Sequence, residues 1–289
     1  TPTAATARIG GPRVTLRGTR EATPEERLVP WTVETEILQA RFGPRGLLGL
    51  ETSGGIRFSS DEGELGGRTF RYDATSRQAS LRGKAHATFG PAEGRSEVRA
   101  DELVMTLGAS GPERLEAVGK TLAVLIRRAE DDPTTMERFF VWCRGVTMTP
   151  TEFRTDDLDQ VMQQRRQLPD GPWISPFSLW SNRVVVTGRD LLSRKTAEVD
   201  RLVATGPRTT LQTGQGEEQT TVWGDRFELD VPISRATLES GPSGDLKIQL
   251  GTTDDERMRL DQTRLVIDIE TGEILDWKHS KVVIRGARK

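Results

Sequence analysis

Hydrophobic and polar residues alternate along much of the chain with a period of two. In 79–89 (ASLRGKAHATF), alternate positions carry apolar side chains or glycine, and the positions between them carry Ser, Arg, Lys, His and Thr. The alternation recurs in 226–233 (RFELDVPI), 245–250 (DLKIQL) and 265–269 (LVIDI). This period gives a strand one apolar face and one polar face, which is typical of antiparallel sheets. The pattern therefore predicts an all-β protein with antiparallel strands.

Short segments rich in Gly, Pro, Asp and Ser separate the predicted strands, at intervals of roughly ten residues. They include YDATSRQ, GASGPE and IETGEI. The last lies in 264–286, where two apolar runs flank a Thr-Gly pair, and Gly272 takes the turn position that favours positive φ. The residues 97–119 also resemble 221–241, which indicates repetition of a hairpin. We expect a ladder of β-hairpins.

One segment departs from the period of two. Residues 155–168 (TDDLDQVMQQRRQL) begin with a potential N-cap threonine and two acidic residues, and a proline follows the last residue. Their apolar residues are spaced for one face of a helix: Leu158, Val161, Met162 and Leu168. This spacing predicts a short helix within an insertion between two β segments. The predicted parts are a flexible N-terminal arm with one short strand, a first β segment, the connecting insertion and a second β segment, at 1–30, 31–130, 131–180 and 181–289.

Composition restricts the possible functions. The 289 residues include 41 Lys and Arg against 43 Asp and Glu, so the net charge of −2 argues against nucleic-acid binding through bulk positive charge. Cys143 is the single cysteine, which excludes a disulfide within the chain. The apolar runs are too short for a transmembrane segment. The chain begins TPTAATARIGGP without Met, so we expect a processed chain whose targeting signal has been removed.

Candidate catalytic residues do not cluster in the sequence. The two histidines, His86 and His279, belong to no metal-binding motif, and no G-x-S-x-G elbow or phosphate-binding loop is present. Paired acids such as Asp156 and Asp157 fall at expected turns or helix starts. We therefore predict no enzyme, no cofactor and no metal. The six tryptophans fit core or rim packing better than a carbohydrate-stacking platform, and they are residues 31, 142, 173, 180, 223 and 277.

The segment TFRYDATSRQASLRGKAHATFGPAEGRSEVRADELVMTL, followed by ERLEAVG, carries a motif. Its elements are an aromatic residue and Asp, a Leu-x-Gly, an Ala-Asp-x-Leu and an Ala-x-Gly, at Tyr72-Asp73, Leu81-x-Gly83, Ala100-Asp101-x-Leu103 and Ala117-x-Gly119. This motif resembles the OstA-like domain of the lipopolysaccharide-transport family. The resemblance runs from Ser53 to Val124 and in parts from Ser181 to the end. Departures are the insertion, the second copy, and Trp223-Gly224 where Ala-Asp is commoner.

The resemblance implies a V-shaped antiparallel β-jellyroll whose interior carries the acyl chains of a glycolipid across the periplasm. It implies lipopolysaccharide, another glycolipid or a phospholipid as ligand. It also implies other β-jellyroll transport proteins as partners, joined by edge-strand pairing. The residues expected to line this groove are Phe70, Tyr72, Leu81, Ala85, Phe89, Leu103, Met105, Leu107, Phe227, Leu229, Val231, Leu246, Ile248, Leu265, Ile267 and Ile269.

Two other hypotheses remain open. The chain can instead be a structural scaffold or an adhesive module whose inner face is a closed, packed core. It can also be an enzyme acting on envelope polysaccharide, which would need a carboxylate cluster that the sequence does not indicate. Small inward residues such as Ala79, Gly83 and Ala87 favour the groove, because a tightly filled core would use uniformly large side chains.

Overall fold

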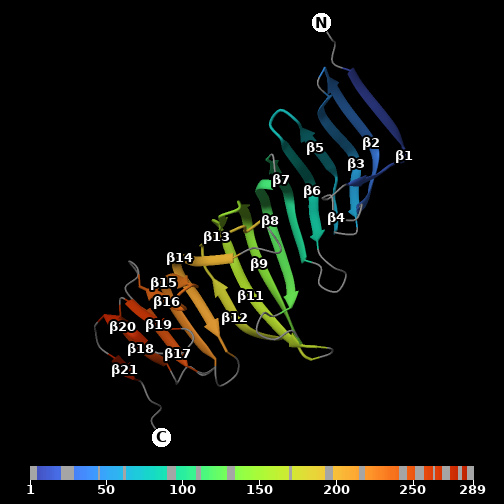
Figure 1. The fold of residues 1–289 in the computed structure, drawn as a ribbon. Coiled ribbons are helices and arrows are strands. Elements are labelled where there is room, and N and C mark those ends of the chain that lie inside the picture. Colours follow the sequence, from blue (N-terminus) through green and yellow to red (C-terminus); the bar gives the residue numbers. More distant parts are fainter. Residues whose placement is uncertain are drawn as a thin grey trace. The chain divides into compact units, whose positions relative to one another are not determined.

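The structure is a computed structural model of the chain. The residues that it describes are 5–20, 29–44, 46–60, 63–89, 96–108, 112–128, 134–168, 171–192, 198–214, 219–240, 246–250, 257–262, 264–268, 274–278 and 282–284. Within these residues every regular element is a strand, and all the strand pairings are antiparallel (Figure 1). The predicted all-β, antiparallel fold is therefore confirmed.

The chain forms two compact units, Thr1–Leu125 and Ile126–Lys289. The first unit contains β1 (Ala5–Arg20), β2 (Val29–Gly43), β3 (Gly46–Ser60), β4 (Gly63–Gly67), β5 (Thr69–Asp73), β6 (Gln78–Phe89), β7 (Ser96–Leu107) and most of β8 (Pro112–Arg128). The second contains β9 (Thr135–Met148), β10 (Glu152–Thr155), β11 (Leu158–Gln167), β12 (Ile174–Trp180), β13 (Arg183–Arg189), β14 (Glu198–Thr213), β15 (Thr220–Asp230), β16 (Arg235–Glu239), β17 (Leu246–Leu250), β18 (Arg257–Gln262), β19 (Arg264–Asp268), β20 (Ile274–Lys278) and β21 (Val282–Ile284).

The predicted helix at 155–168 is wrong, because most of this segment is strand β11. A β-bulge between Leu158 and Gln160 interrupts the pairing of β11 with β9. The bulge adds one residue, so Leu158 and Val161 face the same side, three positions apart, opposite Cys143 and Val141 of β9. The three-residue step from Leu158 to Val161, which suggested a helical face, is therefore produced by a bulge in a strand.

The segment 1–30, for which we expected a flexible arm with one short strand, holds β1. This strand is 16 residues long and pairs with β2 from Ala5 opposite Phe42 to Arg20 opposite Val29. One bulge, between Gly10 and Val14, interrupts the pairing. In Figure 1, β1 is the outermost strand of the first unit.

Long strands of the first unit bend and so take part in two leaves of the folded sheet. β3 shows this directly, since its first half pairs with β5 and its second half with β4. Gly54 and Gly55 separate the halves, with φ of 83° and 95°. The pairings of β6 with β7 and of β7 with β8 also shift register midway. We call this row of bulges the bend line.

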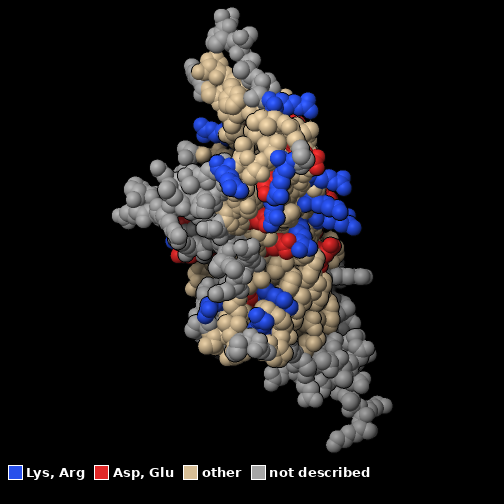
Figure 2. Space-filling view, turned by 90° about the vertical axis from the view of Figure 1, so that its right-hand side faces the viewer, with Lys and Arg blue, Asp and Glu red and all other residues tan. Residues whose placement is uncertain are grey.

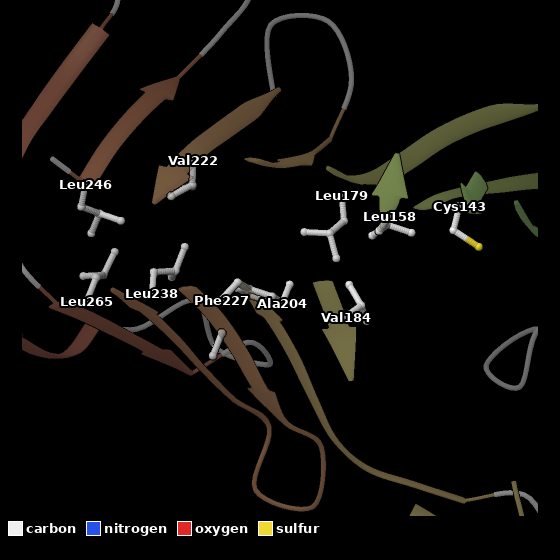
Figure 3. Close-up of a cluster of buried hydrophobic side chains, with 11 residues drawn as sticks. Cys143, Leu158, Leu179, Val184, Ala204, Val222, Phe227, Leu238, Leu246 and Leu265 are labelled. Atoms are coloured by element: carbon white, nitrogen blue, oxygen red, sulfur yellow. The ribbon is translucent and has the colours of Figure 1, made fainter. Parts of the chain in front are cut away.

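In the second unit β14 and β15 cross a similar bend line. Their register shifts between Thr205 and Thr209, around Gly206 and a proline. One leaf contains β10, β13, β16, β19 and β20 with the adjoining halves of β14 and β15 and the end of β9, which pairs with β10. The other contains β11, β12, β17, β18 and β21 with the remaining parts of β9, β14 and β15. Figure 3 shows apolar side chains of the two leaves pointing toward one another. Each unit is thus a folded-over antiparallel jellyroll.

Buried hydroxyl groups stabilise the bend of the second unit. The Oγ of Ser181 lies 3.0 Å from the carbonyl oxygen of Thr205 and 3.1 Å from the Oγ1 of Thr209. Thr209 in turn donates to the carbonyl oxygen of Gly206 at 3.0 Å. Ser181 and Thr209 are 8% and 3% exposed. They satisfy carbonyl groups that the interrupted ladder leaves without strand partners.

Candidate functional site

The inner face of the first unit consists of rows of cross-strand neighbours that run parallel to the bend line. On one leaf the row nearest the bend, which we call the first row, is Leu38, Thr52, Phe70, Leu81, Leu103 and Ala117. All of these are buried except Phe70, which is half-buried. Three large side chains, Phe70, Leu81 and Leu103, follow one another in the middle of this row, between the smaller Thr52 and Ala117.

The next row outward, which we call the second row, is more accessible. On the same leaf it consists of Ala40, Leu50, Tyr72, Ala79, Met105 and Leu115. On the opposite leaf it consists of Leu16, Val33, Phe58, Leu65, Ala87, Val98 and Ala123. Every member of both second rows is half-buried. The inner face is therefore buried next to the bend line and partly exposed to solvent farther from it.

The second unit repeats this layering. The first row on one leaf is fully buried and consists of Thr155, Val184, Ala204, Phe227, Leu238 and Leu265. Figure 3 shows the apolar members of this row facing the other leaf, where Leu246, Val222, Leu179, Leu158 and Cys143 lie. The second row beside it is Phe153, Val186, Leu202, Leu229, Ala236 and Ile267, and only Ala236 among these is buried.

The residues predicted from the sequence to line a groove fall into three groups. Those that the structure buries are Leu81, Ala85, Leu103, Phe227, Leu246 and Leu265. Those that it leaves half-buried are Phe70, Tyr72, Met105, Leu107, Leu229, Ile248 and Ile267. Val231 follows the end of β15 and is 41% exposed, so it belongs to a turn. Ile269 and the side chain of Phe89 lie outside the described part of the chain.

Sequence reasoning missed several second-row residues. They are Phe58, Leu65, Val98, Leu115, Val186 and Leu202. All follow the same alternation as the residues that were chosen, so the period of two was a sufficient signal. Their half-buried, apolar side chains make the second row the surface on which an apolar ligand could displace water.

The outer face of the first unit carries ion pairs instead. Arg57 donates to Glu64 at 2.8 Å, and His86 lies 3.8 Å from the same carboxylate. The hydrogen bond from Arg57 lowers the pKa of Glu64 below its ordinary value, against an opposing effect of burial. Figure 2 shows one face of the molecule on which basic and acidic side chains lie side by side. This charge distribution separates a solvated outside from an apolar inside.

Groups that could support catalysis or metal binding do not converge among the described residues. No set of three or more His, Cys, Asp or Glu side chains comes close enough there to hold a metal ion. Asp156 and Asp157 are exposed and pair with arginines, Arg154 and Arg144. Cys143 is buried, and burial raises the pKa of its thiol. His279 lies outside the described residues. In the described part of the chain, no helix is long and apolar enough to cross a membrane.

The fold and its inner face define an antiparallel β-jellyroll with an apolar, partly open interior. No family model matches the sequence, and no curated protein matches it. Among solved structures the chain is similar to LptH of Pseudomonas aeruginosa, the LptA-homologous periplasmic component of the lipopolysaccharide transport device. The sequence identity is 14% and the TM-score is 0.31. The similarity covers 50% of this chain and 88% of LptH.

Proposed function

We propose that this chain is a periplasmic binding or conduit protein for lipopolysaccharide or a related glycolipid. In this proposal the second rows of the inner face contact the acyl chains during transport to the outer membrane. The observation that carries the proposal is the half-buried state of these apolar rows in both units. Soluble proteins normally bury contiguous apolar surface, and an open apolar trough is typical of a binding site.

The energetics favour a trough of this kind for moving a lipid. Removing an acyl chain from water gains about 0.8 kcal/mol for each CH₂ group. A chain of about twelve carbons would therefore cost on the order of 10 kcal/mol to expose. Rows of apolar side chains such as Tyr72, Met105 and Leu229 would keep the acyl chain out of water and so avoid this free-energy cost. This role requires no nucleophile, general base or cofactor.

Edge-strand pairing is the proposed route to partners. β1 pairs with β2 along one edge and is the outermost strand of the first unit (Figure 1). An exposed edge presents backbone N–H and C=O groups that can accept a strand of another protein. We propose that other β-jellyroll transport proteins join here, which would extend the apolar inner face from one protein to the next.

Site-specific photo-crosslinking tests the proposed function. A photoreactive amino acid is placed at inward second-row positions and at the outward neighbour of each, in pairs: Tyr72 with Arg71, Leu229 with Glu228, and Ile267 with Asp268. We expect adducts with lipopolysaccharide or phospholipid from the inward positions only, after expression in the periplasm of a Gram-negative host. Labelling of both members of each pair, or of neither, would contradict the proposal.

A structural scaffold is the second candidate. The observation that favours it is the packed cluster of buried apolar side chains in the second unit, where Leu179, Leu246 and Leu265 are each no more than 1% exposed. A scaffold or adhesive module needs a stable core and no ligand. Protein that shows no lipid adduct in the crosslinking experiment, and no bound lipid in native mass spectrometry, would favour this alternative.

A further inference from the structure

Two arginines lie against one tryptophan at one end of the second unit. The guanidinium carbon of Arg138, on β9, is 3.8 Å from the centroid of the Trp173 ring, and that of Arg166, on β11, is 4.8 Å from it. Arg138 also lies 5.1 Å from the ring of Phe140, which stacks on Trp142 with ring centroids 5.2 Å apart. Two guanidinium groups and three aromatic rings are thus joined by contacts in one cluster.

These side chains project from the outer face of the leaf. Val141 packs against the buried core, and side chains alternate along β9, so Arg138 and Phe140 project to the opposite side. Arg138 lies opposite Gln164 of β11, and its Nε donates to the Gln164 Oε1 at 2.6 Å. Gln164 in turn donates to Ser175 at 3.1 Å. This hydrogen-bond chain fixes the Nε edge of the Arg138 guanidinium.

The two positive charges are not neutralised by a carboxylate among the described residues. The nearest acid in sequence, Glu137, projects to the inner face, where it is 4% exposed. There it pairs with Arg165 at 3.1 Å and accepts a hydrogen bond from Gln163 at 3.0 Å. The Nε of Arg166 is buried, and no group in the described part of the chain accepts a hydrogen bond from it.

Holding two guanidinium groups together in this way is unfavourable without an anion. Each of the two side chains is half-buried, so its charged group loses part of its hydration. Burial, and then the charge of Arg166, lower the pKa of the Arg138 guanidinium. Cation–π contact offsets part of the repulsion, but it leaves the in-plane N–H groups of a guanidinium unsatisfied. A planar fork of N–H donors matches the oxygens of a phosphate group.

We propose that Arg138 and Arg166, held on Trp173, form a binding site for a phosphate group. The group can be free phosphate, or it can belong to the phosphorylated saccharide of a glycolipid headgroup. The stacked pair of Phe140 and Trp142 adds an apolar surface beside it for the carrier of the phosphate. The site lies on the outer face, so it does not require the inner face to bind lipid.

NMR signals of the arginine side chains test this proposal directly. The Nε–Hε signals of ¹⁵N-labelled protein are recorded by NMR during titration with inorganic phosphate, glucosamine 1-phosphate and unphosphorylated glucosamine. We expect saturable shifts of the Arg138 and Arg166 signals with both phosphate compounds and none with glucosamine. Tighter binding of the sugar phosphate identifies a headgroup as the source, and equal binding identifies free phosphate. Absence of a phosphate-dependent shift in the wild-type protein overturns the proposal.

Variants separate a specific site from general charge. In Arg138→Gln/Arg166→Gln we expect phosphate affinity to fall by about tenfold or more, because charge-assisted hydrogen bonds are lost. The matched control is Arg154→Gln/Arg183→Gln, which removes two exposed arginines that pair with Asp156. Its affinity should stay within about twofold of the wild type. Equal losses in both double variants would overturn the proposal. The wild-type titration decides the question even if a variant does not fold.

Discussion

The carboxylate of Asp101 on β7 occupies the position that a side chain at Gly119 on β8 would need. Gly119 has φ of 84°, and an added Cβ would overlap the Asp101 side chain. An Asp101 carboxylate oxygen also accepts a hydrogen bond from the backbone N–H of Lys120 at 3.3 Å. The Ala-Asp-x-Leu and Ala-x-Gly elements of the sequence motif therefore meet at the bend line and shape it.

Gly119→Ala should destabilise the protein strongly, by about 1–3 kcal/mol, because it adds both a left-handed backbone penalty and a steric overlap. The free energy of unfolding from urea denaturation measures the effect. Gly10→Ala is the matched control, since its added Cβ would meet no atom within 4 Å. Equal losses at both positions would show that strand propensity, and not the bend, sets the cost.

The hydroxyl pair at the second bend gives a parallel prediction. Ser181→Ala should lower the free energy of unfolding by about 1–2 kcal/mol, because the buried Thr209 hydroxyl and the Thr205 carbonyl lose a partner. Chemical denaturation measures the loss. Ser80→Ala on the outer face serves as the control, and we expect a change of less than about 0.5 kcal/mol there. A similarly small change for Ser181→Ala would show that the hydroxyl pair does not stabilise the bend.

Substitutions in the first row should lower stability, and substitutions in the second row should weaken lipid binding. Phe227→Ala removes a side chain that is 5% exposed, so we expect a loss of about 3–5 kcal/mol in unfolding free energy. Leu229→Ala, two residues along the same strand, should cost about 1–2 kcal/mol. Only the second substitution should weaken binding of a fluorescent fatty-acid probe to protein that remains folded. Unchanged probe affinity in Leu229→Ala would count against a second-row binding surface.

Acid should weaken the outer-face ion pair of Arg57 and Glu64. The folded-state pKa of Glu64 lies below its ordinary value, so its contribution to stability is present above the ordinary carboxylate range and lost as pH falls through the folded pKa. Unfolding experiments from about pH 7 to about pH 3 should show a shallower decline for Arg57→Gln than for the wild type. Identical pH profiles would mean that the pair is too exposed to contribute.

Alternation of apolar and polar residues predicted the antiparallel strands where the period of two is unbroken, but it did not predict β11 or the full length of β1. β6 runs from Gln78 to Phe89, as the pattern in 79–89 indicated, and Leu81 and Ala85 are buried. The order of burial among inward residues was not predictable in this way. It depends on distance from the bend line, and that line is formed by bulges on neighbouring strands that meet only after pairing.

Two features escaped sequence reasoning for a common physical reason. At Leu158 a bulge imitated the spacing of a helix, because one extra residue shifts a period of two into a step of three. The contact of Arg138 and Arg166 with Trp173 joins two strands and a connection between strands. No local pattern encodes either, since both arise from the register between β9 and β11.

β14 and β15 each run through both leaves, so the two walls of the second unit are connected covalently by the same two strands. Any change in the spacing between the walls must therefore bend both strands where they pass from one leaf to the other. Such a change would also disturb the buried contacts of Ser181 and Thr209 with the backbone of Thr205 and Gly206.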